Sequence, residues 1–599
     1  MSACYWLNTA WMLTARREAR IFTRSCSRVD RVQHDLLQSI LENNRNSLFG
    51  RRHQFGSVNS IDEFRDRVPI SSHGDYVGDI RRIANGEPGI LTSDRIRLLE
   101  PTGGSDSGEK LIPYNRELHR QFQRAIRTWI ADLFLNRPGV RSGRAFWSLS
   151  PCIPRRTTRG GLPIGFEDDT AYLGQLGRRL VQKTLAVPTS LSRVEDLDVF
   201  RYLLLLHLLG TADLSLISVW SPTYLSVLLK TLEHCSQQIV HDLRHPPLSL
   251  TSQGLPVPAD VLPKISAKRT AEVVRILDAG LPMEETTSQL WPRLDLVSCW
   301  CDGSSHRYVE PLRHLFPGIE IQPKGLVATE GFVSIPRHGF AAPHLAFRSH
   351  FFEFLDCDRN TEHQKQTCLA HELQAGRNYE VLLTTGGGLY RYRLGDVVQV
   401  VDHDGLCPLL RFSGRRGQIS DQVGEKLVEQ HVNTVLQEAL QATNTRVTFS
   451  ILCLADSTPP GYCLFLQDKN SLETKTTTQA IRRTVEDGLG RNPYYRHAVR
   501  FGQLAPLTVC WLAPDGQPGW SIYEQVCRGR RQQWGNIKPR TLDPDRDLFR
   551  ALYTSLPAAQ ESRRAELGHC RHCGRTLAPE NKHGGICHGC APRHEGIVH

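Results

Sequence analysis

At 599 residues and 67.7 kDa, the chain exceeds the roughly 250 to 300 residues at which a single hydrophobic core stops growing, so two or more domains are expected. Hydrophobic residues make up 40% and charged residues 23% of the chain, which excludes a disordered, fibrous or membrane-spanning protein. The net charge of +11 comes from 73 basic and 62 acidic residues spread along the chain, so it favours solubility and a weak attraction for phosphate-rich ligands.

The N-terminus and the cysteines indicate a cytoplasmic protein. The first basic residues follow the first apolar stretch, the reverse of a secretory signal peptide, so we expect residues 1–20 to begin a helix. The 17 cysteines are odd in number, and most stand singly in apolar surroundings, as Cys453 and Cys463 do. We therefore expect reduced core cysteines rather than a disulfide framework.

The first third of the chain predicts helices separated by a glycine-rich loop. Apolar residues at three- and four-residue spacing predict a helix over residues 17–45. Residues 96–100 predict a strand that leads into the glycine loop, and residues 116–136 predict a helix after it. Further on, the long apolar stretch of residues 199–233 predicts buried helices.

The middle of the chain alternates between strand and helix patterns. Strands are expected at residues 294–300 and 319–321, around a helix at 305–315. Two further strands, at 380–384 and 396–401, are joined by a glycine turn. This βαβ-like alternation favours an α/β protein with a mixed sheet.

The pattern restarts near Gly414. Helices are expected at residues 425–440 and 477–489, with a strand pair between them at 446–467. These elements predict a second, α+β domain. A short tail rich in Cys and His closes the chain from about residue 566.

The glycine loop Thr102–Lys110 (TGGSDSGEK) has the groups needed to bind phosphate. Its backbone amides, three hydroxyl groups and lysine can surround the oxygens of a triphosphate. A Walker loop needs GxxxxGK followed by Ser or Thr, but Glu109 takes the lysine position and Leu111 follows Lys110. The chain is therefore not predicted to be a P-loop NTPase, and a plain surface turn is the alternative for this loop.

Two later segments each carry a carboxylate suited to nucleotide binding. Glu330, within Ala328–Gly331 (ATEG), follows an apolar stretch, where a carboxylate could hold the Mg²⁺ that accompanies ATP. Asp396 ends Tyr392–Asp396 (YRLGD), and its two oxygens could accept hydrogen bonds from two ribose hydroxyls. Either acid alone is more often a cap or turn residue, but the three segments in this order predict an ATP-using enzyme.

Together these segments resemble the nucleotide site of the adenylate-forming superfamily. Within it, the chain resembles the Gretchen Hagen family of acyl acid amido synthetases, the auxin-responsive-promoter proteins of plants and their bacterial relatives. The resemblance covers about residues 30–545 and includes Trp220-Ser-Pro-Thr, Leu389-Tyr-Arg-Tyr-Arg and Arg411-Phe. The runs SVWSPTYL and GLVATEGFVSIP resemble the bacterial-type members more than the plant members.

The resemblance implies a ligase that works in two steps. ATP and a carboxylic acid give an acyl-adenylate and pyrophosphate, and an amine, usually an amino acid, then displaces AMP to leave an amide. The implied cofactors are ATP and Mg²⁺, and the implied partners are a small carboxylic acid and an amino acid or other amine. We expect no membrane partner and no nucleic acid.

The resemblance also assigns roles to residues. The phosphate loop would comprise Thr102, Gly103, Gly104, Ser105, Ser107, Gly108 and Lys110. Thr329 and Glu330 would form the adenine and metal motif, with Glu330 both a catalytic residue and the Mg²⁺ ligand, whereas Tyr392 and Asp396 would lie at the ribose. Asp106 departs from the family pattern, and its negative charge opposes phosphate binding unless it faces away or meets the metal.

The implied fold is an α/β protein in three parts. A large N-terminal adenylation domain with mixed sheets and helices would span residues 1–413, and a smaller, mobile α+β domain residues 414–560, with a zinc ribbon at 566–599. Arg415 would lie in the hinge motif between the first two parts. In this superfamily the small domain rotates between the half-reactions and contributes a catalytic lysine, for which Lys538 in GNIKPR is our first choice and Lys426 our second. A solvated surface lysine is the alternative for both.

The tail predicts a structural Zn²⁺ site. Two CxxC pairs, Cys570 with Cys573 and Cys587 with Cys590, are separated by thirteen residues, as in a zinc ribbon. Four thiolates fill a tetrahedral shell and leave no open position for catalysis. The alternatives are a tail without metal and a redox CxxC pair. We expect the ribbon to stabilise a small fold or to bind a protein partner.

Two other functions are weighed against the amido synthetase. One is an acyl-CoA-type ligase, which would share the adenylation half-reaction. The other is a catalytically weakened nucleotide-binding scaffold that carries a zinc ribbon, and Asp106 is its best support.

Overall fold

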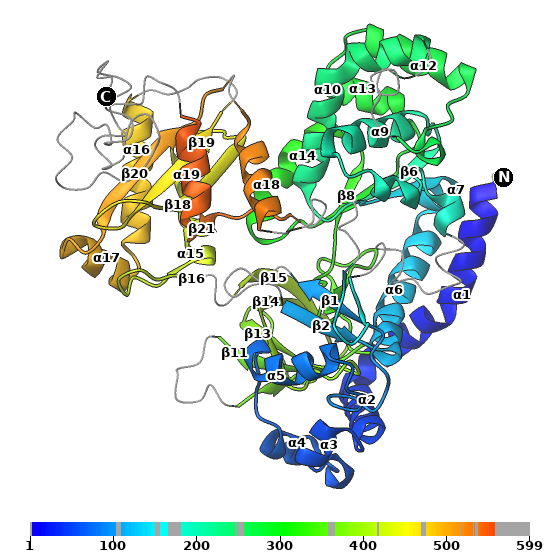
Figure 1. The fold of residues 1–599 in the computed structure, drawn as a ribbon, viewed down its shortest axis with the longest axis vertical. Coiled ribbons are helices and arrows are strands. Elements are labelled where there is room, and N and C mark those ends of the chain that lie inside the picture. The colour runs from blue at the N-terminus through cyan, green and yellow to red at the C-terminus, as the bar shows by residue number, and fades with distance from the viewer. Residues whose placement is uncertain are drawn as a thin grey trace. The chain divides into compact units, whose positions relative to one another are not determined.

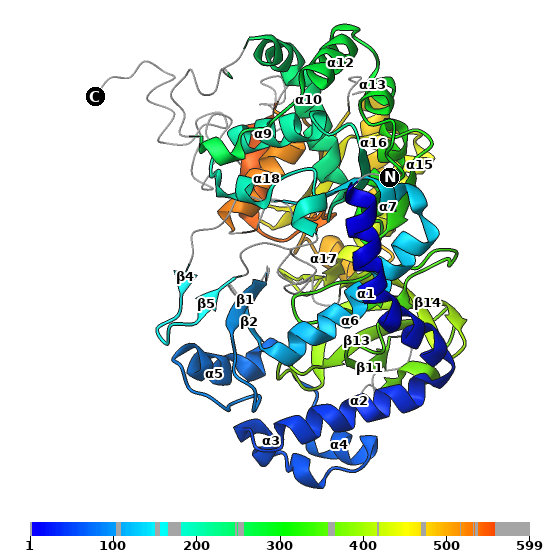
Figure 2. The ribbon, with the colours of Figure 1, turned by 90° about the vertical axis from the view of Figure 1, so that its right-hand side faces the viewer.

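A computed structural model describes most of the chain. The described residues are 3–102, 110–149, 156–165, 181–245, 248, 257–357, 366–415, 419–468, 475–514, 517–530, 532 and 537–556. The chain divides into two compact units between Ser413 and Gly414, and each unit is described by itself (Figures 1 and 2).

The first unit begins with two long helices, and the break between them falls inside the stretch 17–45 that the sequence predicts as one helix. Helix α1 (Ala3–Ser25) and helix α2 (Val29–Asn44) are separated by a 3-10 turn, η1 (Cys26–Arg28). The carbonyl of Cys26 accepts a hydrogen bond from the amide of Leu406 at 2.8 Å, a tertiary contact that a helical pattern does not reveal. Shorter helices follow: α3 (Leu48–Arg52), η2 (Phe55–Ser57), α4 (Ile61–Arg67) and α5 (His73–Ala84).

The glycine loop lies within a β-hairpin rather than between a strand and a helix. Strand β1 (Leu98–Thr102) pairs antiparallel with β2 (Lys110–Tyr114), and Thr102 and Lys110 are partners at the end of the ladder. Helix α6 (Arg116–Asn136) follows over the predicted residues. The side chain of Asn115 caps α6 by accepting the amide N–H of Leu118 at 2.8 Å. The short strands β4 (Arg156–Thr157) and β5 (Pro163–Ile164) complete this sheet in the order β2-β1-β5-β4.

A parallel four-stranded sheet confirms the predicted βαβ alternation. Its order is β3 (Arg144–Trp147), β6 (Leu214–Ser218), β7 (Leu296–Cys299) and β8 (Glu320–Pro323). The prediction of helices alone over residues 199–233 was wrong, because β6 separates α9 (Leu197–Leu209) from α10 (Pro222–Arg244). All five residues of β6 are buried, and periodicity alone cannot distinguish such a strand from a buried helix segment.

The remaining helices of this unit connect the parallel strands or precede them. They are α7 (Pro138–Ser142), η4 (Thr189–Arg193), η5 (Ala259–Val261), α12 (Ala267–Asp278), α13 (Met283–Leu290), η6 (Gly303–Tyr308) and α14 (Val309–Leu315). Figure 1 shows α9, α10, α12 and α13 (green) grouped in the upper part of the view.

A seven-stranded antiparallel sheet completes the first unit, in the order β12-β11-β13-β14-β15-β10-β9. Its strands are β9 (Ser334–Ile335), β10 (His344–Leu345), β11 (Phe351–Asp356), β12 (Cys368–Leu369), β13 (Asn378–Thr384), β14 (Tyr392–Asp404) and β15 (Cys407–Arg415), with η8 (Ala370–Glu372) after β12. The predicted glycine turn joins β13 to β14. A Cβ atom on Gly386 would lie 2.6 Å from the side chain of Glu117 on α6, so only glycine allows the turn to approach that helix.

The second unit is built on a four-stranded sheet, β20-β19-β18-β21. Strands β18 (Phe449–Ala455) and β19 (Gly461–Gln467) form the predicted pair, between α15 (Glu429–Ala442) and α16 (Lys475–Leu489). The other elements are β16 (Ile419–Ser420), β17 (Leu427–Val428), α17 (Pro493–Arg500), β20 (Ala505–Trp511), α18 (Gly519–Gly529), β21 (Leu542–Asp543) and α19 (Arg546–Thr554).

Candidate active site

The ATEG segment forms a tight turn between β8 and β9. Ala328 and Gly331 exchange backbone hydrogen bonds of 3.0 and 3.2 Å, and Val327 and Phe332 form an antiparallel bridge at its base. A Cβ atom on residue 331 would lie 3.1 Å from the imidazole of His350, so glycine permits this close packing. The turn therefore fixes the direction of Glu330 through its own backbone.

Two tyrosine hydroxyls hold this turn from different elements. Tyr114, at the end of β2, donates to the carbonyl oxygen of Thr329 at 2.5 Å. Tyr392, at the start of β14, donates to Oε1 of Glu330 at 3.3 Å. Glu330 is only 4% exposed. The structure thus brings Thr329, Glu330 and Tyr392 together, as the sequence-based assignment of these residues to one site requires.

A buried neutral histidine supports the ATEG turn from behind. His350 Nε2 lies 3.0 Å from the amide of Phe332 and must accept its hydrogen, so Nδ1 carries the proton and donates to Gln121 Oε1 at 3.0 Å. Burial, and to a smaller degree the positive charge of Arg124, lowers the pKa of His350 to about 3. His350 is therefore a neutral structural element, and sequence reasoning did not single it out.

Asp396 lies in an irregularity of β14. Leu382 pairs with Arg393 and Glu380 pairs with Val397, so the single residue Val381 faces three residues of β14. Gly395 within this bulge has a φ of 81°, which glycine adopts without strain. Bulges of this kind redirect side chains, and the bulge at Gly395 sets the direction of the Asp396 side chain. Asp396 is only 7% exposed.

The turn before β14 is anchored by a buried ion pair that the sequence did not reveal. Arg391 has a φ of 47°, uncommon for a residue with a side chain. Its guanidinium contacts both carboxylate oxygens of Glu353, at 2.9 and 3.1 Å, and both side chains are at most 5% exposed. It also donates to the carbonyl of Val68 at 2.8 Å. Through its contact with Val68, the Arg391 side chain joins the turn before β14 to the segment that precedes α5.

The hairpin places the two ends of the glycine loop side by side. Thr102 ends β1 and Lys110 begins β2. The pKa of His73, at the start of α5, is lowered by burial and by the positive charge of Lys110, so His73 is neutral beside that lysine. Gly103, Gly104, Ser105, Asp106, Ser107 and Gly108 lie outside the described residues.

Lys538 lies in an extended segment of the second unit. Its carbonyl accepts a hydrogen bond from the Tyr523 hydroxyl at 2.9 Å, and the amide of Thr541, just beyond it, donates to Glu429 Oε1 at 2.7 Å. These contacts fix the backbone at the carbonyl of the lysine and just beyond it. Arg415, the predicted hinge residue, is the last residue of β15 and is half-buried.

Lys426, our second choice for the catalytic lysine, stands in a different setting. Its backbone has a φ of 47°, and its ammonium nitrogen lies 5.4 Å from the centre of the Tyr494 ring. This cation–π contact gives Lys426 a local role. The neighbouring residue, Glu425, has a buried carboxylate that accepts hydrogen bonds from the hydroxyl of Tyr462 and from two backbone amides. These bonds fix the backbone of the turn before Lys426.

The predicted zinc ligands Cys570, Cys573, Cys587 and Cys590 lie outside the described residues. Within the described part of the chain, the one group of acids close enough to share a cation is Asp543, Asp545 and Asp547. Arg530 already occupies this group, with a contact of 2.8 Å to Asp543 and 2.9 Å to Asp547. The guanidinium supplies the positive charge that a metal would otherwise bring.

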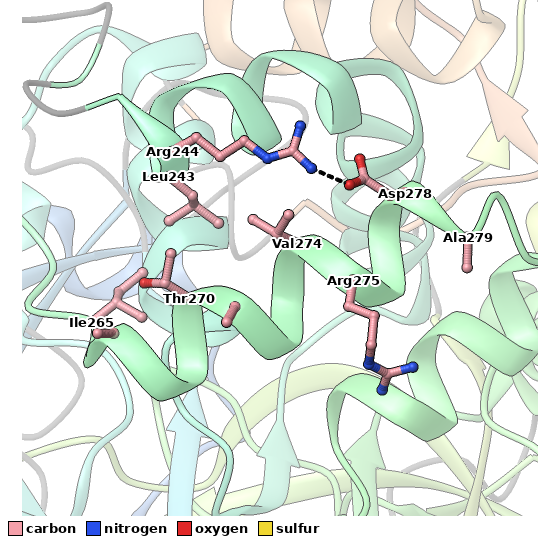
Figure 3. Close-up of a pocket in the computed structure, with 10 residues that line it drawn as sticks. Leu243, Arg244, Ile265, Thr270, Val274, Arg275, Asp278 and Ala279 are labelled. Carbon is pink, nitrogen blue, oxygen red and sulfur yellow. Dashed lines mark hydrogen bonds and ion pairs between the residues drawn. The ribbon is translucent and has the colours of Figure 1, made fainter.

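An open groove lies between α10 and α12, separate from the residues above (Figure 3). An ion pair between Arg244 and Asp278 spans one side, and Leu243, Ile265 and Val274 supply its apolar lining. Arg275 points away from that pair in Figure 3. Because none of the predicted nucleotide-binding residues lines this groove, we do not place the active site there.

In the described residues, we find no helix with the length and apolar character needed to cross a bilayer.

Models of one family match most of the chain. The GH3 family N-terminal domain matches residues 18–321, the GH3 family central domain residues 344–415, and the GH3 family C-terminal domain residues 429–544.

Individual relatives agree with these matches. The chain is 26% identical over 497 residues to "Indole-3-acetic acid-amido synthetase GH3.10" of Arabidopsis thaliana, covering 76% of this chain and 83% of the relative. It is 25% identical over 445 residues to the jasmonoyl-L-amino acid synthetase JAR6 of Nicotiana attenuata, covering 72% and 76%. Its fold is similar to the solved structure "AtGH3.15 acyl acid amido synthetase in complex with 2,4-DB", with a TM-score of 0.78 at 19% identity over 90% of this chain and 96% of that chain.

Proposed function

The chain belongs to the GH3 family, and from that premise we propose that it is an ATP-dependent acyl acid amido synthetase. It adenylates a carboxylic acid, which releases pyrophosphate, and then transfers the acyl group to an amine, which releases AMP. Its relatives are named for different acids, among them indole-3-acetic acid and jasmonic acid, so the proposal is for the carboxylic acid class. An amino acid is the proposed acceptor.

The observation that carries the proposal is the hydrogen bond between Tyr392 and Glu330. It joins the ATEG turn to strand β14, so that Glu330 and Asp396 can serve the same nucleotide. Carboxylate oxygens are the ligands that Mg²⁺ prefers, and Glu330 fits this requirement. When bound, ATP supplies the adenylyl group and Mg²⁺ offsets the charge on its phosphates. Asp396 would accept the ribose hydroxyls.

The hairpin loop supports the first half-reaction. Thr102 and Lys110 are ladder partners at the two ends of the loop, and they would bring a hydroxyl and an ammonium group to the phosphates that the loop is proposed to hold. His73 stays neutral beside Lys110 and does not add a second charge there. Holding the phosphates and the carboxylate in line is most of what transfer of the adenylyl group from ATP to the acid, with release of pyrophosphate, requires.

The second unit contributes the proposed catalytic lysine. We propose that Lys538 acts in one of the two half-reactions and that Arg415 belongs to the hinge on which this unit rotates. The backbone contacts at the carbonyl of Lys538 and at Thr541 support this role, because they hold the chain just beyond the lysine.

Three finer features complete the proposal. We propose that Cys570, Cys573, Cys587 and Cys590 bind one structural Zn²⁺ as a ribbon that docks a protein partner. We also propose a cytoplasmic location, on the basis of single cysteines in apolar surroundings, and a bacterial-type member of the family, on the basis of the SVWSPTYL pattern. Zinc content measured by mass spectrometry, in the full chain and in a Cys570→Ser, Cys573→Ser double variant, tests the ribbon: the ratio should be one per chain and should fall toward zero in the variant.

The experiment that tests the activity measures pyrophosphate release with a panel of carboxylic acids. The panel includes indole-3-acetic acid, jasmonic acid and 2,4-DB, and each acid is assayed with ATP and Mg²⁺, first alone and then with amino acids or coenzyme A. Amide formation with an amino acid supports the proposal. Thioester formation instead would favour the acyl-CoA ligase, and nucleotide binding without pyrophosphate release from any acid would favour the weakened scaffold.

A further inference from the structure

The parallel sheet of the first unit ends in one row of side chains that point to the same face. The row consists of Trp147 of β3, Ser218 of β6, Ser298 of β7 and Gln322 of β8, which the strand register pairs in that order. All four stand at or next to the carboxyl end of their strand, the edge at which open α/β sheets bind ligands. Helix α6 covers this face, because Trp129 donates its indole N–H to Gln322 Oε1 at 3.3 Å.

Lys324 reaches across this row from the edge strand. Its amide donates to the carbonyl of Cys299 at 2.8 Å, which extends the ladder one residue beyond β8. Lys324 follows Gln322 by two residues, so its side chain points to the same face. Its ammonium donates to Ser218 Oγ at 2.7 Å, and because β7 lies between β6 and β8, the lysine side chain crosses over β7.

Two indole rings flank the ammonium group of Lys324. The nitrogen lies 5.6 Å from the ring centre of Trp129 and 4.8 Å from that of Trp220, which follows Ser218 by two residues. Lys324 is half-buried. Cation–π contacts stabilise an ammonium group that has lost part of its water. These surroundings suit an anion with an apolar body, which can pair with the charge and pack against the rings.

The row also contains a hydroxyl group that the fold does not satisfy. Ser298 is fully buried, and within the described part of the chain its Oγ has no hydrogen-bond partner. It stands between Ser218 and Gln322, on the strand that the Lys324 side chain crosses. A buried polar group without a partner in the chain calls for one outside it, such as a water molecule or a ligand.

The chain that leaves Lys324 leads directly to the ATEG turn. The amide of Leu326 donates to Ser334 Oγ at 2.9 Å, and the carbonyl of Leu326 accepts the amide of Val333 at 2.9 Å. These bonds fix the segment between β8 and the turn. Lys324 and Glu330, the proposed Mg²⁺ ligand, therefore belong to one anchored segment of seven residues.

We propose that the ammonium group of Lys324 binds the carboxylate of the acid substrate before adenylation. This inference rests on the proposed function, because it takes the carboxylic acid of that reaction as the ligand. The carboxylate accepts a charge-assisted hydrogen bond from Lys324, and its apolar body packs against Trp129 and Trp220. A carboxylate oxygen then attacks the α-phosphorus of ATP and pyrophosphate leaves, so no proton passes through Lys324.

The other two substrates fit these surroundings less well. A triphosphate is strongly hydrated and suits the backbone amides and hydroxyls of a glycine loop rather than a site bounded by indole rings. An amino acid carries an ammonium group of its own, which Lys324 repels. The acid alone combines a single anionic group with an apolar body.

Steady-state kinetics of the full chain test the proposal. In Lys324→Met, the KM for an accepted acid should rise about 10- to 100-fold, as expected for the loss of a charge-assisted hydrogen bond, while the KM for ATP should stay unchanged. Ser218→Ala, which removes the hydroxyl that holds the ammonium, should raise the KM for the acid by less. Lys268→Met is the matched control, because it removes the same charge from an exposed position on α12, and it should behave as the wild type does.

Titration calorimetry without ATP separates this inference from the proposed function. The ligands are indole-3-acetic acid, jasmonic acid and 2,4-DB, each compared with its carboxamide, which lacks the charge. The wild type should bind an acid more tightly than its carboxamide, whereas Lys324→Met should bind the two alike. That result supports the inference even if no acid releases pyrophosphate, in which case the proposed function alone fails.

Four outcomes would overturn the inference. They are an unchanged KM for the acid in Lys324→Met, a rise in the KM for ATP or for the amino acid instead, equal binding of acid and carboxamide by the wild type, and no binding of any of the three acids. The comparison of acid with carboxamide uses the wild type alone, so it decides the matter even if Lys324→Met fails to fold.

Discussion

The hydroxyl of Tyr392 lies 3.3 Å from Oε1 of Glu330, across 62 residues of sequence. This contact places the start of β14 against the ATEG turn. Because Tyr392 and Asp396 belong to one strand, the same contact sets the position of Asp396, the proposed ribose acceptor, relative to Glu330, the proposed Mg²⁺ ligand. The enzyme proposal can therefore be tested at this junction.

The carboxylates of Glu330 and Asp396 are each expected to be required for adenylation. Glu330→Ala removes the proposed Mg²⁺ ligand, and Asp396→Ala removes the acceptor of the ribose hydroxyls. Isotope exchange between ATP and pyrophosphate, measured with an accepted acid, should fall to background in both variants. Asp402→Ala is the control, because Asp402 is an exposed acid on the same strand, and it should retain full exchange. Normal turnover in Asp396→Ala would contradict the site assignment.

Tyr392→Phe should slow adenylation without abolishing it. The substitution keeps the ring but loses a hydrogen bond to a carboxylate, which contributes about 1.5–3 kcal/mol. A fall of roughly 10- to 100-fold in kcat/KM is expected, together with a higher Mg²⁺ requirement. Tyr379→Phe removes a hydroxyl that accepts from the amide of Gln374, within the same sheet, and should leave the Mg²⁺ dependence unchanged. Equal Mg²⁺ dependence in both variants would argue against the role of the Tyr392 contact.

Lys538→Ala should impair one half-reaction more than the other. Pyrophosphate exchange reports the first step, and amide formation from a preformed acyl-adenylate reports the second. Lys426→Ala is the comparison, because the Lys426 ammonium is engaged by the ring of Tyr494, and it should change both rates little. Identical rate losses in the two steps for Lys538→Ala would remove the lysine from its proposed role.

The Arg391–Glu353 pair should matter for stability rather than for a single catalytic step. Arg391→Met removes the forked partner of the buried Glu353 carboxylate, which keeps the Arg65 guanidinium at 3.2 Å and the Thr367 hydroxyl at 2.6 Å. The cost in the free energy of unfolding should therefore lie between the about 1 kcal/mol of an exposed pair and the about 3–5 kcal/mol of a buried charge left wholly unpaired. The Arg391→Met, Glu353→Leu double variant should recover part of this loss. Urea unfolding of the single and the double variant measures both changes in the free energy of unfolding. Arg313→Met, which removes an exposed ion pair, should cost less than about 1 kcal/mol.

The stability of the first unit should fall in acid because of His350. An unfolded histidine titrates near 6.5, whereas the pKa of His350 in the folded chain is lowered to about 3. Between these values the unfolded chain binds a proton that the folded chain does not. The free energy of unfolding should therefore drop as the pH falls below about 6.5, by up to about 1.4 kcal/mol per pH unit from this residue.

Denaturant unfolding from pH 7.5 to 5 measures this dependence. His350→Gln should flatten it, since glutamine does not titrate. His314→Gln, at an exposed position on α14, should leave the pH dependence as it is in the wild type. A slope that is the same in all three proteins would assign the acid sensitivity to other groups.

Local patterns in the sequence predicted the long elements well. Helix α6 begins and ends at the predicted residues, because Asn115 provides an N-cap and the apolar spacing that follows is strictly helical. The βαβ alternation and the glycine turn after β13 were also predicted correctly. Elsewhere, α1 and α2 form two helices because a loop distant in sequence binds the carbonyl of Cys26, and β6 was missed because a wholly buried strand has no alternation.

The sequence by itself determined which side chains could do the chemistry: the hydroxyls and lysine of the glycine loop, Glu330, Asp396 and the two candidate lysines. Only the tertiary structure decided how Glu330 and Asp396 are held. The Tyr392 contact, the bulge at Gly395, the neutral His350 and the Arg391–Glu353 pair are all long-range or conformational features. Their energies depend on burial and on distances between distant segments, and neither quantity is encoded in the spacing of residues along the chain.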